Sequence, residues 1–277
     1  MRLGTPLPRI WDSPDGWVAA LRDGGFRTAY WPLDDDAGPD EVADYANAAA
    51  AAGIVIAEIG AWSNPISPDE ATRAAAVERC KLRLELADRV RARCCVNIAG
   101  TRAHSWDGPH PDNLSADTFA LIVDTVRDIL DAVQPRRTFY SLEPMPWSLP
   151  DSPDSYLELL RAIDRPRLGV HLDPVNMINS PAKFYDNAGF LRECFAKLGP
   201  YVKSCHAKDI ALGDRLTVHL AEVRPGLGAL DYRVFLTEMD RLDPDTPLLV
   251  EHLSSDAEYA AAVAHVRAVA GELGLTT

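Results

Sequence analysis

Residues 167–176 read RLGVHLDPVN. Leu168, Val170 and Leu172 are apolar, as one face of a buried strand should be, whereas His171 and Asp173 have the opposite parity, because side chains alternate faces along a strand. The proline that follows Asp173 ends the strand, since it has no N–H for the ladder. A carboxylate at such a tip needs a cation or a donor. Asp173 is therefore either part of a polar site or only a cap for the next helix.

Seven further apolar runs have the length of strands, at residues 2–6, 26–31, 54–59, 94–99, 138–142, 202–206 and Pro247–Val250. Helical patterns alternate with them, at residues 12–25, Pro39–Ala52, 67–91, 115–133, 154–163, 190–198, 232–242 and 256–273. One strand and one helix in about 30 residues is the spacing of βαβ units. The pattern predicts an α/β protein with a single (β/α)8 TIM barrel over residues 1–277, with an irregular segment at 208–228. A doubly wound open sheet is less favoured, because no Gly-x-Gly-x-x-Gly follows the first strand.

The composition excludes several classes of protein. Hydrophobic residues make up 47% and charged residues 25% of the chain, as in ordinary soluble globular proteins. The formal net charge of −13, without a cluster of Lys and Arg, disfavours binding to nucleic acid. No apolar run reaches the ~20 residues of a membrane helix, and residues 1–6 lack a signal-peptide core, so we expect a cytoplasmic protein. The five cysteines include no C-x-x-C pair, which argues against a disulfide framework and a structural zinc.

Polar residues end four consecutive predicted strands: Glu143, Asp173, His206 and Glu251. In a (β/α)8 barrel, the carboxyl ends of the strands meet at one mouth. Three carboxylates crowded there resist ionisation unless a cation neutralises them. Oxygen-rich ligation with one imidazole suits Mn²⁺, Mg²⁺ or Co²⁺ better than a closed zinc site. We therefore expect one divalent metal ion, with Mn²⁺ preferred.

Other polar residues have strand parity or loop positions that direct them toward the same mouth. His171 is a candidate acid or base, or a partner that orients Asp173. Lys208 is a candidate for stabilising an oxyanion, or it pairs with a nearby acid. The candidate substrate-binding residues near the ends of earlier strands and in the loop at 100–114 are Glu58, Asn97, His104 and Trp106.

Four local motifs and one glycine-rich turn resemble those of the xylose isomerase-like barrels, in particular their sugar phosphate isomerase/epimerase branch: Leu142-Glu143-Pro144, Asp173-Pro174-Val175-Asn176, His206-Ala207-Lys208-Asp209, Val250-Glu251-His252 and residues 225–231, PGLGALD. The resemblance implies that Glu143, Asp173, His206 and Glu251 hold one metal ion. It also implies that Glu143 and Glu251 move protons on opposite faces of the substrate.

The chain departs from the ketose 3-epimerases of this branch at two positions. Those enzymes carry a histidine that touches substrate three residues after the metal aspartate, where this chain has Asn176. Their arginine shortly after the metal histidine has Arg215 and Arg224 as candidate counterparts. We therefore include Asn176 and Arg224 among the expected substrate-binding residues.

The resemblance implies an isomerase or epimerase that acts on a ketose or keto-sugar through a metal-stabilised enediolate. If a group leaves from the β-carbon, the same intermediate gives a lyase or dehydratase on a keto-sugar, a keto-cyclitol or a 3-oxo-glycoside, including C- or O-deglycosylation. An abasic-site endonuclease is disfavoured by the acidic charge and the seven histidines. A non-catalytic sugar-binding barrel is the remaining alternative. We expect a carbohydrate partner, neither nucleic acid nor membrane, and a homo-oligomer, either a dimer or a tetramer.

Overall fold

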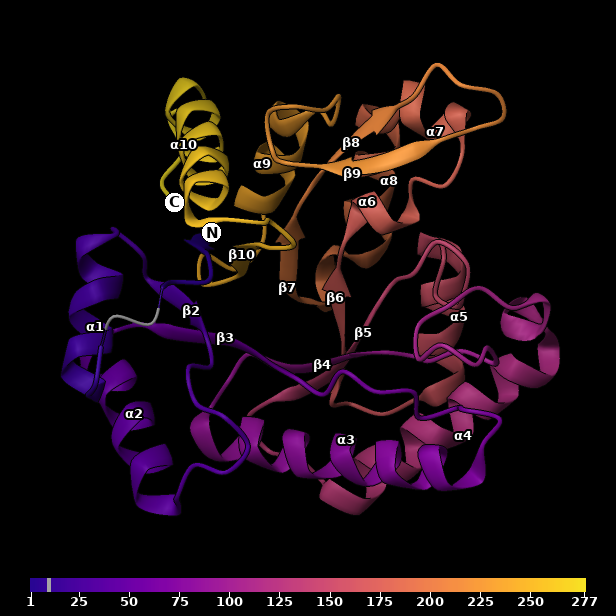
Figure 1. Cartoon of the computed structure of the whole chain (residues 1–277), viewed down its shortest axis with the longest axis horizontal. Helices are drawn as coiled ribbons and strands as arrows, with labels where there is room; N and C mark the ends of the chain where they lie inside the picture. The colour runs from indigo at the N-terminus through magenta and orange to yellow at the C-terminus, as the bar shows by residue number, and fades with distance from the viewer. Residues whose placement is uncertain (9–10) are drawn as a thin grey trace. The chain divides into compact units, whose positions relative to one another are not determined.

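The computed structural model describes residues 1–8 and 11–277. Eight strands belong to one sheet with the order β1-β10-β7-β6-β5-β4-β3-β2, which follows the chain, and the strands alternate with helices (Figure 1). The strands of this sheet are β1 (Arg2–Gly4), β2 (Thr28–Tyr30), β3 (Val55–Gly60), β4 (Cys94–Ile98), β5 (Phe139–Glu143), β6 (Leu168–Leu172), β7 (Val202–Ala207) and β10 (Pro247–Val250). This topology confirms the predicted (β/α)8 fold class.

Within the fold, the chain divides into two compact units. The first unit comprises Met1–Ala57, Ile178–Phe195 and Ser204–Thr277, apart from residues 9–10. The second unit comprises Glu58–Met177 and Ala196–Lys203. The prediction of a single domain over residues 1–277 stays a prediction.

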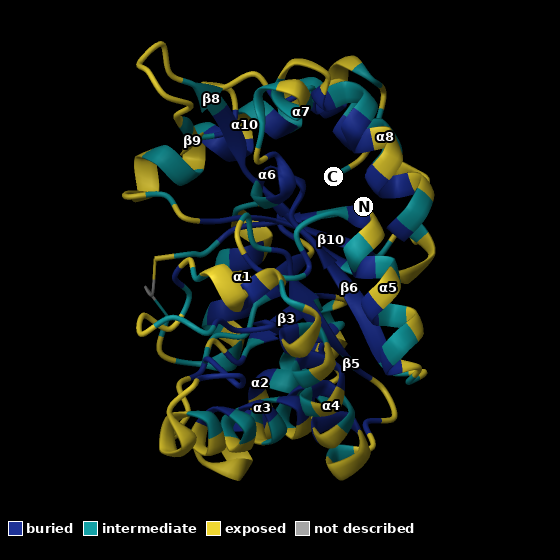
Figure 2. Ribbon diagram, turned by 90° about the vertical axis from the view of Figure 1, so that its right-hand side faces the viewer, coloured by how far each residue is buried: buried dark blue, intermediate teal, exposed yellow. Residues whose placement is uncertain are grey.

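The second unit contains β4, β5 and β6, which pair in parallel. Its helices are α3 (Glu70–Val90), α4 (Ala116–Val133) and α5 (Pro153–Ile163), with the short 3-10 helix η1 (Pro111–Leu114) before α4. The β5 and β6 strands are almost wholly buried, whereas α5 exposes part of its surface (Figure 2). Side-chain caps from Ser115 and Ser152 satisfy backbone N–H groups where α4 and α5 begin. These local signals explain why the helix boundaries agree closely with the sequence pattern.

The first unit contains β1, β2 and β10, with helices α1 (Pro14–Asp23), α2 (Pro39–Ala52), α9 (Tyr232–Asp240) and α10 (Asp256–Glu272). β1 pairs in parallel with β10. β1 and β2 stand at the two ends of the strand order, yet a Cβ atom added at Gly4 would lie 2.8 Å from a side-chain carbon of Thr28 and 2.6 Å from one of Leu249. The glycine thus allows β1 to lie close to both of these neighbours.

The segment between β7 and α9 differs from the prediction. Instead of being irregular throughout, it forms an antiparallel hairpin of β8 (Asp209–Leu212) and β9 (Leu220–Val223). The buried Asp209 fixes the turn after the hairpin, since its carboxylate accepts backbone N–H bonds from Gly226, Gly228 and Leu230 at 2.9–3.0 Å. The Asp209 side chain thus connects the start of β8 to the turn that follows β9.

The connection after β6 is also more helical than predicted. It contains α6 (Pro174–Met177), α7 (Pro181–Tyr185) and α8 (Asn187–Leu198), and α8 begins three residues before the predicted helix at 190–198. The 3-10 helix η2 (Gly199–Tyr201) leads into β7. Asp186 accepts from the N–H of Gly189 at 3.2 Å, which supports the earlier start of α8.

All five cysteines are buried and none forms a disulfide: Cys80, Cys94, Cys95, Cys194 and Cys205. Burial raises the pKa of the thiols of Cys80 and Cys95. Buried cysteines behave as small apolar residues, so these side chains contribute to the core. Among the residues that the structure describes, no helix combines the length and apolarity that a bilayer crossing requires.

Candidate functional site

Two carboxylates lie together at the carboxyl ends of β5 and β6 in the second unit. Glu143 is the last residue of β5 and Asp173 follows β6, and both are buried. Oxygen atoms of the two carboxylates lie within 4.8 Å of each other. Two acids this close repel each other when ionised, so the pair favours a cation or a shared proton.

The Asp173 side chain has two roles in the structure. Its Oδ1 accepts the backbone N–H groups of Val175 and Asn176, at 3.0 and 3.2 Å, so Asp173 does cap α6. The Asn176 side chain in turn donates to Glu143 Oε1 and to the carbonyl of Pro144, both at 3.1 Å. Asn176 therefore lies beside Glu143, and the predicted cap and the predicted acidic pair occur together.

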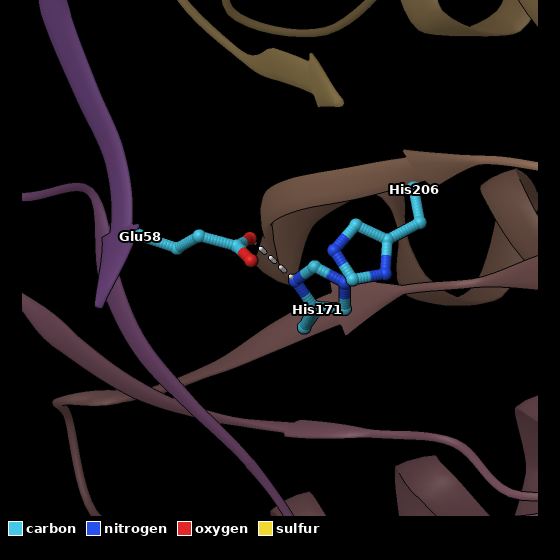
Figure 3. A group of neighbouring side chains, drawn as sticks. All are labelled: Glu58, His171 and His206. Carbon is cyan, nitrogen blue, oxygen red and sulfur yellow. Dashed lines mark ion pairs between the residues drawn. The ribbon is translucent and has the colours of Figure 1, made fainter. Parts of the chain in front are cut away.

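His171 pairs with Glu58, again within the second unit. His171 Nδ1 lies 3.3 Å from Glu58 Oε2, and both side chains are buried, 0% and 2% exposed (Figure 3). This pair joins β6 to β3. Glu58 is thus placed next to a candidate acid or base, and its contact gives His171 a defined ring orientation.

Asn97 has a different environment from the other candidates. Its side-chain oxygen accepts the backbone N–H of Ser63 at 3.0 Å, and its amide nitrogen contacts Cys80 Sγ at 3.2 Å. The residue is fully buried. These contacts give Asn97 a role in fixing the loop after β3, and its predicted role in substrate binding stays a prediction.

In the first unit, an imidazole and a carboxylate lie together with a buried lysine. His206 Nδ1 lies 2.8 Å from Glu251 Oε1, and Lys208 Nζ lies 2.7 Å from the same oxygen. The Lys208 side chain is 1% exposed. The predicted pairing of Lys208 with a nearby acid is confirmed, and Lys208 also lies within reach of the proposed ligand Glu251.

The charge of Glu251 is stabilised by its neighbours. Burial alone raises the pKa of this carboxyl group, but His206, Lys208 and His252 outweigh that effect and hold the pKa well below its usual range. Glu251 is therefore anionic at neutral pH, which a metal ligand requires.

Two charged residues outside the predicted set surround this group. Glu222 Oε2, on β9, lies 3.4 Å from Lys208 Nζ, and Glu222 Oε1 lies 3.3 Å from His252 Nδ1. The hydrogen bond to Glu222 raises the pKa of His252 above its ordinary value, against the effect of burial. Sequence reasoning missed Glu222 because its segment was expected to be irregular. His252 has a positive φ of 57°. Its position directly after Glu251 was the feature of the sequence that could have identified it as a site residue.

The predicted loop residues are more exposed. His104 and Trp106 lie on the surface of the loop after β4. Arg224, in the first unit, pairs through its Nε with Glu258 at 3.0 Å. Sequence reasoning did not include Trp62 and Trp147, which are exposed on the loops after β3 and β5. Their position directly after strands was the signal that could have identified them.

Parallel strands in chain order, with helices between them and acidic and imidazole groups at strand ends, define a (β/α)8 barrel with an active-site arrangement typical of enzymes. The chain belongs to the xylose isomerase-like TIM barrel family, whose model matches residues 18–269. This membership confirms the resemblance inferred from the motifs.

Solved structures share the fold over nearly the whole chain. D-psicose 3-epimerase from Clostridium cellulolyticum H10 is 13% identical, with a TM-score of 0.69 over 97% of this chain and 99% of its own. The probable 3-DHS dehydratase AsbF from Bacillus anthracis is 18% identical, with a TM-score of 0.69 over 97% and 98%. Endonuclease IV from Thermus thermophilus is 17% identical, with a TM-score of 0.71 over 98% and 100%. At these identities the likeness concerns the fold.

Proposed function

We propose that this protein is a divalent-metal-dependent sugar isomerase or epimerase that acts on a ketose or keto-sugar. The observation that carries the proposal is the close carboxylate pair of Glu143 and Asp173 in a chain of the xylose isomerase-like family. The similarity to a psicose 3-epimerase supports a carbohydrate substrate. The acidic charge of −13 argues against the DNA chemistry that the name of endonuclease IV implies.

The metal ligands in this proposal are the four residues that the family resemblance implies: Glu143, Asp173, His206 and Glu251. Three carboxylates and one imidazole form a hard donor set that suits Mn²⁺, with Mg²⁺ and Co²⁺ as alternatives. Glu251 fits this role, because its neighbours hold its carboxylate as an anion. A bound cation would stabilise the negative charge that forms on the substrate oxygen when a carbon-bound proton leaves.

The proton transfers are assigned to residues of this chain. One of Glu143 and Glu251 accepts the proton next to the substrate carbonyl, and the other returns a proton to the same or the neighbouring carbon. Asn176 orients Glu143 through the bond to Oε1. Lys208 holds Glu251 in place and supplies a positive charge near the developing oxyanion.

A second function, a lyase, is favoured by Asn176. Ketose 3-epimerases have a histidine that touches substrate at this position, whereas the amide of Asn176 is already bonded to Glu143 and to the carbonyl of Pro144. In an O-linked 3-oxo-glycoside, a glutamate would remove the proton at C2, the C1–O bond would break as the C1–C2 double bond forms, and the departing oxygen would take up a proton from the protonated glutamate. No carbon would then be protonated. The similarity to a probable dehydratase also supports this alternative.

Solvent-deuterium exchange tests both functions. The protein is incubated with Mn²⁺ in D₂O with a panel of ketoses and 3-oxo-glucosides, and label uptake and elimination products are followed by NMR and mass spectrometry. We expect Mn²⁺-dependent labelling of a carbon next to the carbonyl that EDTA abolishes. Glu143→Gln and Glu251→Gln should lose the labelling, whereas Glu272→Gln, which removes an exposed partner of Arg233, should retain it.

The outcomes separate the hypotheses. Epimer or isomer formation supports the first function, and release of the C1 substituent supports the lyase. Labelling that persists after metal removal, or that survives in both glutamine variants, would refute the proposed chemistry. Metal analysis of the same variants provides a second readout, because loss of a ligand should lower the Mn²⁺ content regardless of turnover.

A further inference from the structure

Three tryptophans are exposed on consecutive loops at the carboxyl ends of β3, β4 and β5. Trp62, Trp106 and Trp147 are 38%, 46% and 41% exposed, and all belong to the second unit. Large aromatic side chains usually bury most of their surface, so three exposed indoles on neighbouring loops need a reason. We call this set the tryptophan loops, comprising residues 61–69, 99–110 and 144–152.

The first two tryptophan loops are joined by buried hydrogen bonds. The side chain of Asn64 donates to the carbonyl of Thr101 at 2.8 Å and accepts the N–H of Thr101 at 2.9 Å. Arg102 NH1 donates to the carbonyl of Ile66 at 2.6 Å. Trp62 and Trp106 are therefore carried on loops whose relative positions are fixed by three bonds.

The second and third tryptophan loops are also joined. The indole N–H of Trp147 donates to the carbonyl of Asp107 at 2.8 Å, next to Trp106. Asn113, which is fully buried, donates to the carbonyl of Trp147 at 3.2 Å. These bonds fix the three loops before any ligand binds, and preorganisation of this kind favours binding.

Two of the three indole N–H groups face the protein. The Trp147 N–H is already used within the protein. The Nε1 edge of Trp62 faces Gly60, since a Cβ atom at Gly60 would lie 2.1 Å from Trp62 Nε1. The surface thus offers aromatic carbon more than hydrogen-bond donors. An aryl ring can stack on such a surface over its whole face, whereas a sugar ring offers only its C–H groups and leaves its hydroxyls without partners there.

The tryptophan loops are continuous with the candidate site. The third loop begins directly after Glu143 and reaches Trp147 four residues later. Asn176 bonds both Glu143 and Pro144, which fixes the start of this loop relative to the acidic pair. The third tryptophan loop therefore begins at the acidic pair of the candidate site.

We propose that the tryptophan loops bind the aromatic aglycone of a glycoside whose sugar ring occupies the candidate site. This inference rests on the proposed function and narrows its substrate to aryl-substituted sugars rather than free monosaccharides. The three exposed indoles carry it, because they offer more stacking surface than the C–H groups of a free ketose can use.

Calorimetric titration of the Mn²⁺-loaded protein tests this inference with two probes, phenyl β-D-glucopyranoside and methyl β-D-glucopyranoside. We expect the phenyl glucoside to bind about tenfold more tightly, as aromatic stacking in a preformed site allows. Trp62→Ala, Trp106→Ala and Trp147→Ala should each reduce this preference by about threefold. Gly60→Ala, which displaces Trp62 without removing it, should do the same.

Tyr201→Ala is the matched control. Tyr201 is 43% exposed but precedes β7, at the opposite end of a strand, and its loss should leave the preference unchanged. Equal binding of the two probes, no binding of either, or an equal loss in the control would overturn the inference. The preference is also measured in Glu143→Gln. If it persists there while the wild-type protein shows no deuterium exchange, the proposed function fails and the aryl site stands.

Discussion

Replacement of Lys208 by methionine should destabilise the protein strongly. Lys208 Nζ lies 2.7 Å from Glu251 Oε1, with the two side chains 1% and 11% exposed. Methionine fills a similar volume but leaves the buried carboxylate without its cation. Breaking a buried pair in this way costs about 3–5 kcal/mol. Because Glu251 keeps its 2.8 Å contact with His206, we expect the lower end, about 3 kcal/mol.

Urea unfolding followed by circular dichroism at pH 7, with EDTA present, measures this cost. The matched control is Lys197→Met, which removes a 2.6 Å pair with Asp154 whose side chains are 32% and 70% exposed. Exposed pairs contribute below about 1 kcal/mol, so the control should unfold close to the wild type. If the two variants lose the same free energy of unfolding, within about 0.5 kcal/mol, burial does not govern the Lys208 pair and the reasoning is wrong.

Three further predictions concern other parts of the chain. Asp88 accepts the backbone N–H groups of Arg136, Arg137 and Thr138, and although burial alone raises its pKa, these bonds lower it below the ordinary value. The ionised Asp88 side chain therefore stabilises the folded protein above pH ~4, and this contribution is lost as the pH falls toward the lower pKa of the folded state. We therefore expect the thermal midpoint of Asp88→Asn to fall less between pH 6 and pH 2 than that of the wild type. A steeper fall in the variant would contradict this sign. Gly228→Ala places a Cβ atom 2.3 Å from Asp209 Oδ1 and should cost about 1–3 kcal/mol in urea unfolding. Gly38→Ala, where nothing lies within 4 Å, should cost no more than about 0.5 kcal/mol, and equal costs would argue against close packing of the turn. Asn176→Asp adds a third carboxylate to the pair of Glu143 and Asp173, in place of an amide that lies 3.1 Å from Glu143 Oε1, and should lower kcat for the exchange reaction about tenfold more than Asn176→Ala. Equal kcat values for these two variants would show that the charge at position 176 does not affect Glu143.

Local signals made most of the fold predictable from the sequence. Pro39–Ala52 and Pro247–Val250 were predicted with their observed bounds, because a proline at the start and a glycine at the end mark the helix, and a short apolar run marks the strand. Asp69 rather than Ser67 caps α3, so the predicted start was three residues early. Both residues are good caps, and only the backbone conformation decides between them.

The hairpin of β8 and β9 was not predictable in the same way. Its strands are four residues each, and its turn lacks the Asn-Gly or Asp-Gly pair that identifies short hairpins. The hairpin is stabilised through Asp209, which bonds residues 17–21 positions away along the chain. Contacts at such separations leave no periodic pattern in the sequence.

Individual residues of the candidate site were easier to predict than their contacts. Strand-end positions identified Glu143, Asp173, His206 and Glu251 as candidate ligands. The pairs between Asn176 and Glu143 and between Glu58 and His171 depend on how neighbouring strands align. The exposed Trp62 and Trp147 were missed because exposure is not visible in a sequence, where a tryptophan is first expected in the core.

Thiol labelling of the five buried cysteines can measure how often the folded protein opens. A thiol reagent can reach these buried side chains only when the surrounding structure opens. Cys80 and Cys95 lie in the second unit and Cys205 lies in the first, so the labelling rate of each cysteine would record how often its own unit opens. Mass spectrometry of the labelled peptides could thus distinguish a protein that opens as a whole from one whose units open separately.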